Sequence, residues 1–501
     1  MSGRLFLGVD IGTYSAKGVL AREDGAIVAS HVVEHALDIP GPGRAEHDPE
    51  KVWWRGFIEI CRALLAAPGA AAGRVDAVGI STISPAIVAV DGEGRALRPA
   101  ILYGIDTRAS REIAELERAT GAALDSQSAA PKVLWIRRNE PEVWARTRKI
   151  VNGSGFLTLR LTGEATIDIY DASIFAPFFD TASLAWSSQI APLVAPVELM
   201  PRPTWACEIA GRITAAAARE TGLPAGTPVI TGTADAAAEA VSAGLSVPGD
   251  MMVMYGSSTF FILRTETLTA ARGFWSSGFL EKDSFVVAGG TATAGSLTRW
   301  FRDNFGGAET AAERDGGANA YSALAGLAAS SPPGARGLVA LPYFSGERTP
   351  VHDPDARGAI LGLTLGHARA DVYRALLESV GYAIRHNIES LAAQGCRARR
   401  ILAVGGGTRN RLWMQMVSDI AGIEQVFPSR QIGASYGDAF LAAVGVGAFS
   451  GVRDISRWVS PESIVRPSPD AGLVYQDYYR VYRALYDQNA ALMHELARLG
   501  R

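Results

Sequence analysis

The chain has little cysteine and no marked excess of charge of either sign. Its 501 residues include three cysteines, Cys61, Cys207 and Cys396, which are far apart and form neither a disulfide framework nor a metal-ligand spacing. We therefore expect a reducing compartment and a cytoplasmic protein. The 48 Lys and Arg residues nearly balance the 51 Asp and Glu residues. This balance gives no electrostatic reason to expect nucleic acid or an anionic membrane as a partner.

Two further absences concern membranes and nucleotide folds. The apolar runs are too short for a signal peptide or a membrane span, so we expect neither. The sequence also has no P-loop ending in Lys-Ser or Lys-Thr, and no GxGxxG motif followed by an acid, which disfavours those two nucleotide folds. A chain of this length exceeds one compact core, so we expect two large domains.

The most informative stretch that is present is residues 5–20, LFLGVDIGTYSAKGVL. Its apolar run predicts a buried strand that ends at Asp10, followed by a tight turn at Gly12 and a second strand. Such a turn suits a phosphate and its metal, because turn amides and Thr13 can donate to phosphate oxygens and Asp10 can hold a magnesium water. Lys17 either meets a phosphate or is a solvated strand residue. An ordinary hairpin with a capping Asp is the alternative.

Strands mixed with helices along the chain predict an α/β architecture. We place the domain boundary at the turn of residues 246–250, which gives domains at 1–245 and 246–501. Beyond this turn, residues 251–267 repeat the pattern of residues 5–20, with a strand, a Gly-hydroxyl turn and a strand. This weak internal symmetry suggests two related domains that face each other.

Four strand-to-glycine turns need a common explanation. They are Gly12-Thr13 after Asp10, Gly232-Thr233 before Asp235, Gly256-Ser257-Ser258, and Gly405-Gly406-Gly407. No single one of these short motifs is specific. Two hairpin turns from opposed domains could clamp the phosphates of a nucleotide, and the helix after the triple glycine could receive its nucleoside end.

Taken with the blocks between these turns, the chain resembles the FGGY carbohydrate kinases, most closely their xylulokinase branch, over nearly its whole length. The blocks that carry the resemblance are VDIGTYSAK (9–17), AEHDPEKVWW (45–54), LRPAILYGIDTRAS (97–110), APKVLWIRRNEPEVW (130–144), the C-domain signature within 345–378, GGGTRNRLWMQMVSDIAG (405–422) and ASYGDAFLAAVG (434–445). The fold implied is two ribonuclease-H-like domains of the actin and sugar-kinase superfamily, with ATP and sugar in the central cleft.

The resemblance implies a role for each glycine turn. Asp235 matches the catalytic base, although a helix N-cap is its alternative, and Asp10 orients magnesium through water. The residues implied for the ATP phosphates are Gly12, Thr13, Lys17, Gly232, Thr233, Gly256, Ser257 and Ser258. Those implied for adenosine are Gly405, Gly406, Gly407 and Asn410. Plain structural turns are the alternative for both groups of glycines.

The residues that we expect to bind the acceptor are Ser84, Pro85, Asp106, Arg108 and Asp235. Asp106 and Arg108 end a strand at the inner edge of the domain. Trp54 matches a family position, but it lies on a helical apolar stripe, where a Trp is more often a core residue than a ligand contact.

Two departures from the xylulokinase pattern concern the sugar. Residues 83–86 stand where that pattern has Gln-Met-His-Gly, so that Ser84 and Pro85 are aligned with the Met and the His, and Ala236 stands where the family has Asn. A pocket without these two polar groups would leave some xylulose hydroxyls unpaired, at a cost of about 1–3 kcal/mol each when buried.

We therefore predict an enzyme that uses ATP and Mg2+ to phosphorylate a terminal hydroxyl of a small sugar, such as the ketopentose xylulose, or of a related polyol. The alternatives are a kinase for another acceptor (ribulose, a deoxy sugar or a tetritol), a nucleotide-dependent sugar sensor without catalysis, and an actin- or chaperone-like ATPase. The expected partner is a small molecule, and a homodimer is the assembly considered.

Overall fold

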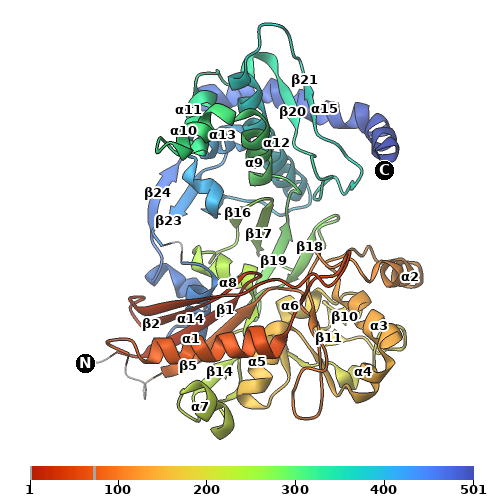
Figure 1. The fold of residues 1–501 in the computed structure, drawn as a ribbon, viewed down its shortest axis with the longest axis vertical. Coiled ribbons are helices and arrows are strands. Elements are labelled where there is room, and N and C mark those ends of the chain that lie inside the picture. Colours follow the sequence, from red (N-terminus) through yellow and green to blue (C-terminus); the bar gives the residue numbers. More distant parts are fainter. Residues whose placement is uncertain (1–2, 71–74, 431, 501) are drawn as a thin grey trace. The chain divides into compact units, whose positions relative to one another are not determined.

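The computed structural model describes residues 3–70, 75–430 and 432–500 (Figure 1). The chain forms two compact units. Unit 1 comprises Met1–Ser246, Ser277–Phe285 and Ile432–Val459, and unit 2 comprises Val247–Ser276, Val286–Gln431 and Ser460–Arg501. The expected single division after residue 245 therefore needs one correction, because two later segments pack with the N-terminal part.

Unit 1 is built on a mixed sheet whose strand order is β13-β14-β5-β1-β2-β3, with β15 also paired to β5. Its strands are β1 (Leu5–Ile11), β2 (Ser15–Arg22), β3 (Ile27–Glu34), β5 (Val75–Thr82), β13 (Ile209–Arg212), β14 (Pro228–Ile230) and β15 (Thr233–Ala234). β1 pairs antiparallel with β2 and parallel with β5. All seven residues of β1 are buried, as expected for the apolar run that opens the chain.

Helices and short strands surround this sheet. The helices are η1 (Pro49–Trp54), α1 (Arg55–Leu65), α2 (Ser110–Thr120), α3 (Ala129–Asn139), α4 (Pro141–Arg146), α5 (Gly153–Thr162), α6 (Ile169–Ser173), η3 (Ala191–Leu193), η4 (Val197–Leu199), α7 (Ala215–Thr221), α8 (Asp235–Ser242), α14 (Ala434–Gly445) and η7 (Val452–Arg457). The short strands are β4 (Glu46–His47), β6 (Val88–Val90), β7 (Ala100–Ile101), β8 (Lys149–Val151), β9 (Thr166–Asp168), β10 (Phe179–Asp180), β11 (Ala185–Trp186) and β12 (Arg202–Thr204).

Helix α14 explains why a late segment belongs to unit 1. It packs against β1, β5 and α8, and it does so backbone against backbone. A Cβ atom added at Gly8 of β1 would lie 1.9 Å from the carbonyl oxygen of Ser435, and one added at Gly79 of β5 would lie 2.1 Å from that of Asp438. Gly437 approaches Ala238 of α8 equally closely. Glycine at these positions lets a helix lie directly on the sheet.

The second seven-stranded sheet lies mostly in unit 2 and has the order β18-β19-β17-β16-β22-β23-β24. Its strands are β16 (Asp250–Tyr255), β17 (Thr259–Thr265), β18 (Trp275–Gly278), β19 (Phe285–Gly289), β22 (Arg400–Val404), β23 (Gln425–Pro428) and β24 (Pro461–Val465). β16 is antiparallel to β17 and parallel to β22, which repeats the arrangement of β1 with β2 and β5. The internal symmetry predicted from residues 5–20 and 251–267 is therefore present.

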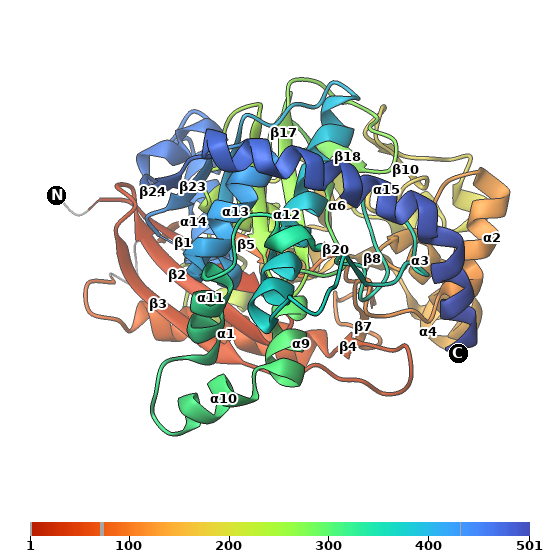
Figure 2. The ribbon, with the colours of Figure 1, turned by 90° about the horizontal axis from the view of Figure 1, so that it is seen from above.

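The helices of unit 2 are α9 (Gly295–Phe305), α10 (Gly307–Arg314), α11 (Ala320–Ala329), η5 (Ala335–Gly337), α12 (Arg369–Ala392), η6 (Gly406–Arg409), α13 (Arg411–Ala421) and α15 (Pro469–Leu499). A small hairpin is formed by β20 (Val339–Leu341) and β21 (Ala359–Leu361). Figure 2 shows α15 lying across α12 and α13, with which it is in contact. Tyr475, Tyr479 and Tyr482 of α15 are buried in the unit 2 core. Within the described ranges, no helix is both long and apolar enough to cross a membrane.

Candidate active site

The carboxyl ends of three neighbouring strands bring polar side chains together in unit 1. Asp10 of β1 lies opposite Ser81 of β5, and Ser81 lies opposite Thr233 of β15. Asp235 follows β15 directly as the first residue of α8. Parallel strands present their carboxyl ends at one edge of a sheet. Asp10 and Asp235, which are far apart in the sequence, therefore share one site.

Asp235 combines partial exposure with a shifted pKa. Its side chain is partly exposed, and its Oδ1 atom accepts a hydrogen bond from the amide of Ala236 at 2.7 Å. The N-cap of α8 is Ala234, so the alternative role of Asp235 as an N-cap does not apply. Burial, followed by the nearby charge of Asp10, raises the pKa of Asp235 well above its usual value. A raised pKa makes a carboxylate a better proton acceptor.

Asp10 lies within an oxygen-rich set of side chains. Ser81 Oγ is 3.2 Å from Asp10 Oδ1, and Lys17 lies opposite Asp10 on β2. Burial and the charge of Glu239 raise the pKa of Asp10 to about 7, against the opposing effects of Lys17 and Ser81. No group of three metal-ligating side chains occurs in the described part of the chain. One or two carboxylates are the protein ligands that magnesium typically takes when phosphates and water supply the others, so Asp10 fits that ion.

Two histidines that were not predicted as site residues, His35 and His47, lie next to the turn after β1. His35 Nε2 lies 3.0 Å from the carbonyl oxygen of Gly12, and Thr13 Oγ1 lies 3.0 Å from the hydroxyl of Tyr103. Next to His35, His47 Nδ1 accepts a hydrogen bond from Trp53 Nε1 at 3.0 Å. Burial lowers the pKa of both histidines, that of His47 to about 4. Both imidazole rings are therefore neutral where they pack next to the turn.

Replacing His47 with Gln is expected to reduce the pH dependence of stability. Below a pH of about 6.5 the unfolded chain protonates His47, whereas the folded protein resists protonation until the pH falls to about 4. The contribution of His47 to the free energy of unfolding is therefore complete above a pH of about 6.5, and it is lost as the pH falls toward about 4. The melting temperature of the wild type should drop relative to H47Q between pH 7 and pH 4.5. A difference that is constant with pH would contradict this expectation.

Trp54 belongs to the core of unit 1. Its side chain is buried, its Nε1 atom donates to Glu220 Oε2 at 3.0 Å, and the Arg160 guanidinium lies 4.7 Å from its ring centre. Of the two interpretations drawn from the sequence, the structure supports the core one.

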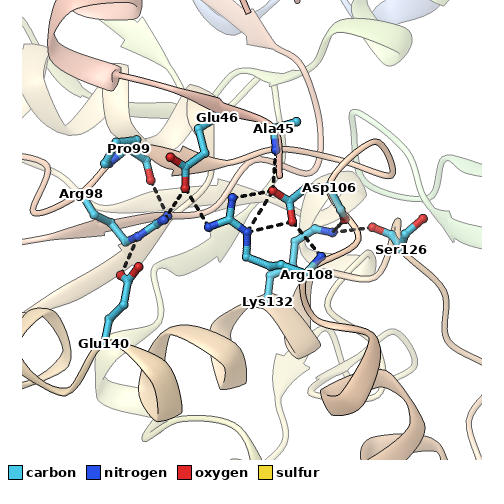
Figure 3. Close-up of polar contacts among 9 residues, drawn as sticks. All are labelled: Ala45, Glu46, Arg98, Pro99, Asp106, Arg108, Ser126, Lys132 and Glu140. Carbon is cyan, nitrogen blue, oxygen red and sulfur yellow. Dashed lines mark hydrogen bonds and ion pairs between the residues drawn. The ribbon is translucent and has the colours of Figure 1, made fainter. Parts of the chain in front are cut away.

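Asp106 and Arg108 are not free to bind a sugar, which corrects the expected substrate role (Figure 3). The Arg108 guanidinium donates to both Asp106 oxygens, with Nη2 at 2.6 Å from Oδ2, and Nη1 donates to Glu46 at 2.7 Å. The backbone amide of Ala45 also donates to Asp106. Arg98 contributes a second guanidinium to Glu46. These buried groups tie β4 and Arg98 to the segment before α2, and their polar atoms are engaged within the protein.

Replacing Arg108 with Met is expected to destabilise the protein by about 3–5 kcal/mol, because it leaves the Asp106 carboxylate buried without its partner. The Michaelis constant for the sugar should change little in the fraction that folds. Arg95→Met, which removes an exposed pair with Asp91, is the matched control and should cost less than about 1 kcal/mol. Thermal unfolding and steady-state kinetics test this, and a large rise in the sugar constant without destabilisation would restore the substrate role.

A second polar cluster lies next to Ser84 and was not predicted. Ser84 Oγ donates to Asp171 Oδ1 at 2.6 Å, and Asn152 Nδ2 donates to Asp171 Oδ2 at 2.5 Å. Thr233 donates to Asp168, which precedes α6. Burial raises the pKa of Asp171 to about 6 and that of Asp168 well above its usual value. The sequence signal was the pair of acids in IDIYDAS, which precedes the apolar segment IFAPFF.

In unit 2, the turn after β16 adjoins the start of α9. The carbonyl oxygen of Ser257 accepts from the amides of Ala294 and Ser296, and that of Gly256 accepts from the amide of Gly295. The turn of residues 256–258 is thus held by a helix N-terminus. The sequence allowed two interpretations of residues 256–258, a phosphate-binding turn and a structural turn. The hydrogen bonds of this turn are compatible with both.

The triple glycine follows β22, whose Val404 lies opposite Met254 of β16, so both turns of unit 2 are at one sheet edge. Gly405 has a φ of 91°, and a Cβ atom added there would lie 2.8 Å from the carbonyl oxygen of Tyr255. Around Gly406, by contrast, a Cβ atom would meet nothing within 4 Å. Asn410 is the N-cap of α13, with Oδ1 accepting from the amide of Trp413. The Asn410 side chain therefore caps α13.

Comparison with known proteins agrees with this arrangement. Residues 5–242 match the N-terminal domain, and residues 251–446 the C-terminal domain, of the FGGY family of carbohydrate kinases. The chain is 30% identical to a xylulose kinase of Escherichia coli (strain K12) over 98% of this chain and 100% of that protein. It is 28% identical to a xylulose kinase of Staphylococcus epidermidis over 99% of each chain. The crystal structure of xylulose kinase from Rhodospirillum rubrum is similar with a TM-score of 0.90 and 32% identity, over 98% of this chain and 100% of that one.

The chain belongs to the FGGY family of carbohydrate kinases. The expected two-domain α/β fold of the sugar-kinase type is thereby confirmed. The protein is a phosphotransferase that acts on a sugar hydroxyl, with ATP as its second substrate. This assignment replaces two of the alternative functions considered from the sequence, the sugar sensor without catalysis and the actin- or chaperone-like ATPase.

Proposed function

We propose that this kinase phosphorylates a terminal hydroxyl of a ketopentose, with xylulose as the first candidate, and that Asp235 is the general base. The observation that supports the base most directly is the position of Asp235 at the shared edge of β1, β5 and β15, partly exposed and with a raised pKa. The names of the relatives, which are xylulose kinases across nearly the full chain, support the acceptor.

In the proposed reaction, residues at different strand ends have different roles. Asp235 accepts the proton of the sugar hydroxyl as that oxygen attacks the terminal phosphate of ATP. Thr13 and the amides of its turn would hold phosphate oxygens. Magnesium, when bound, neutralises charge on the phosphates, and Asp10 would hold it through water. The residues proposed for the ATP phosphates are Gly12, Thr13, Lys17, Gly232, Thr233, Gly256, Ser257 and Ser258, and those for adenosine are Gly405, Gly406, Gly407 and Asn410.

The acceptor can differ from xylulose, and a specific observation favours keeping a second candidate. Pro85 and Ala236 offer no side-chain hydrogen bond where the xylulokinase pattern has two polar groups. Beside them, the Ser84 hydroxyl proton is directed to Asp171. A pentulose of different configuration, a deoxy sugar or a tetritol has a different set of hydroxyls and is the alternative acceptor.

ADP release measured over a panel of pentuloses, hexuloses and polyols tests the proposal. We expect turnover that depends on a sugar, with the highest kcat/KM for a ketopentose. A tetritol or deoxy sugar as the best substrate would replace the proposed acceptor but leave the kinase assignment unchanged. ADP release that is the same with and without every sugar would contradict the proposed function.

A further inference from the structure

The carboxyl group of Glu347 joins two loops of unit 2 and takes no part in the reaction described above. Glu347 lies between β20 and β21, and its side chain is buried. Its Oε1 atom accepts hydrogen bonds from two backbone amides, that of Ala292 at 2.8 Å and that of Arg348 at 2.7 Å. The first of these bonds spans 55 residues and reaches the loop between β19 and α9. The Glu347 side chain therefore connects two segments that are far apart in the sequence.

Thr349 forms a second connection between the same two loops. The backbone amide of Gly290 donates to Thr349 Oγ1 at 2.9 Å, and the amide of Thr349 donates to the carbonyl oxygen of Gly290 at 3.1 Å. Thr349 is in turn fixed by α12, because Asn387 Nδ2 donates to its carbonyl oxygen at 3.0 Å. The loop of residues 290–292 is thus held at two points by the segment of residues 347–349.

The same loop leads into the helix start that holds the turn of residues 256–258. A Cβ atom added at Gly290 would lie 2.2 Å from the carbonyl oxygen of Thr259, so the loop passes directly against the residue that follows this turn. The amide of Thr291 donates to Thr259 Oγ1 at 3.2 Å. Further along, the amides of residues 294–296 donate to carbonyl oxygens of the turn itself. The position of the turn therefore depends on the position of this loop.

The connection through Glu347 does not depend on its charge. Burial raises the pKa of Glu347 to about 7, and a carboxyl group offers an acceptor oxygen in both its neutral and its ionised form. The other oxygen, Oε2, has no hydrogen-bond partner in the part of the chain that the structure describes. A buried polar atom without a partner costs stability. This cost offsets what the two bonds at Oε1 contribute to stability, whereas their effect on the position of the loop remains.

We propose that Glu347 is a positioning residue for nucleotide binding: it holds the loop of residues 290–292 and, through this loop, keeps the turn of residues 256–258 in the position that binds the phosphates of ATP. The inference rests on the proposed function in one respect, namely that this turn binds phosphates. The competing explanation is that Glu347 only stabilises unit 2. In that case its loss would lower the melting temperature and leave the affinity for nucleotide unchanged.

Calorimetric titration with ADP and magnesium, without any sugar, separates these explanations. Glu347→Ala should raise the dissociation constant of ADP roughly threefold to tenfold, as expected for one lost hydrogen bond. Glu347→Gln keeps an acceptor oxygen for both amides and should stay within about twofold of the wild type. Asp419→Ala is the matched control, because Asp419 is also buried in unit 2 and accepts a backbone amide, that of Ser468, from a distant segment. This control should lower the melting temperature and leave the dissociation constant unchanged.

Steady-state kinetics give a second readout. In Glu347→Ala the half-saturating concentration of ATP should rise by a similar factor, whereas that of the sugar should stay unchanged. If Glu347→Ala fails to fold, Thr349→Val carries the test, because it removes the acceptor for the amide of Gly290 and should also weaken ADP binding. Wild-type affinity for ADP in the folded variants, or a loss in Glu347→Gln equal to that in Glu347→Ala, would overturn the proposal.

Gly256→Asp tests the phosphate role of the turn by itself. An added Cβ atom at Gly256 would lie 3.4 Å from the carbonyl oxygen of Ser258, an ordinary contact, so a side chain fits there. If the turn binds phosphates, the new carboxylate should repel them and weaken ADP binding more than about tenfold. Unchanged ADP binding in Gly256→Asp would overturn the phosphate role of the turn and the inference with it. A loss in Gly256→Asp but not in Glu347→Ala would overturn the inference alone.

Discussion

Replacing Asp235 with Asn is expected to lower the rate of sugar-dependent ADP release by about 10²–10⁴-fold, the usual contribution of a general base. The amide cannot accept a proton from the sugar hydroxyl at neutral pH. Asn can still accept the hydrogen bond from the amide of Ala236, so the start of α8 should be unchanged. The decrease should appear in kcat, because the missing interaction belongs to the transition state.

The measurement is a coupled assay of ADP release with saturating ATP and sugar, together with thermal unfolding. The melting temperature should change by only a few degrees. Asp24→Asn, in an exposed turn where Asp24 Oδ1 likewise accepts from a backbone amide, is the matched control and should keep full activity. Retention of more than a tenth of the wild-type kcat in Asp235→Asn would show that another group receives the proton.

Replacing Gly8 with Ala is expected to destabilise unit 1 by about 3 kcal/mol or more, at or beyond the upper end of overpacking effects. The new Cβ atom would lie 1.9 Å from the carbonyl oxygen of Ser435 and 2.4 Å from the amide nitrogen of Ala439. Both are backbone atoms of α14, so no side-chain rotation relieves the clash. The helix must move away from β1, and Asp438 moves with it.

Thermal unfolding and activity together test this effect, because a chain of two units need not unfold in a single step. Gly326→Ala is the matched control. It lies within α11, where an added Cβ atom meets nothing within 4 Å, so alanine should be neutral or stabilise the helix by up to about 1 kcal/mol. An unchanged melting temperature in Gly8→Ala would mean that α14 does not pack on the sheet as described.

The local sequence pattern was sufficient to predict those parts of the site that lie within one short segment of the chain. The strand, turn and strand of residues 5–20 form as predicted, and Asp235 starts the predicted helix. These predictions succeed because the spacing of apolar residues and the position of glycine determine a hairpin and a helix start within about 15 residues.

Long-range pairing explains what the sequence could not show. Asp106 and Arg108 stand at a strand end as a binding pair would, but Glu46 and Ala45, more than 50 residues away, occupy their polar atoms. Asp438 lies in a segment that resembles the adenosine motif, yet its helix packs on the first sheet. No local pattern records which distant partner a charged side chain will meet.

The position of α14 sets the order in which the molecule can be completed during synthesis. Ser81 and Asp438 are separated by 357 residues, which a ribosome adds in roughly 20–70 s. During that time the glycine-lined face of β1 and β5 has no helix of its own to cover it. The strands made first are therefore among the last to acquire their native surroundings, and a fragment that ends near residue 245 would display a permanently uncovered sheet.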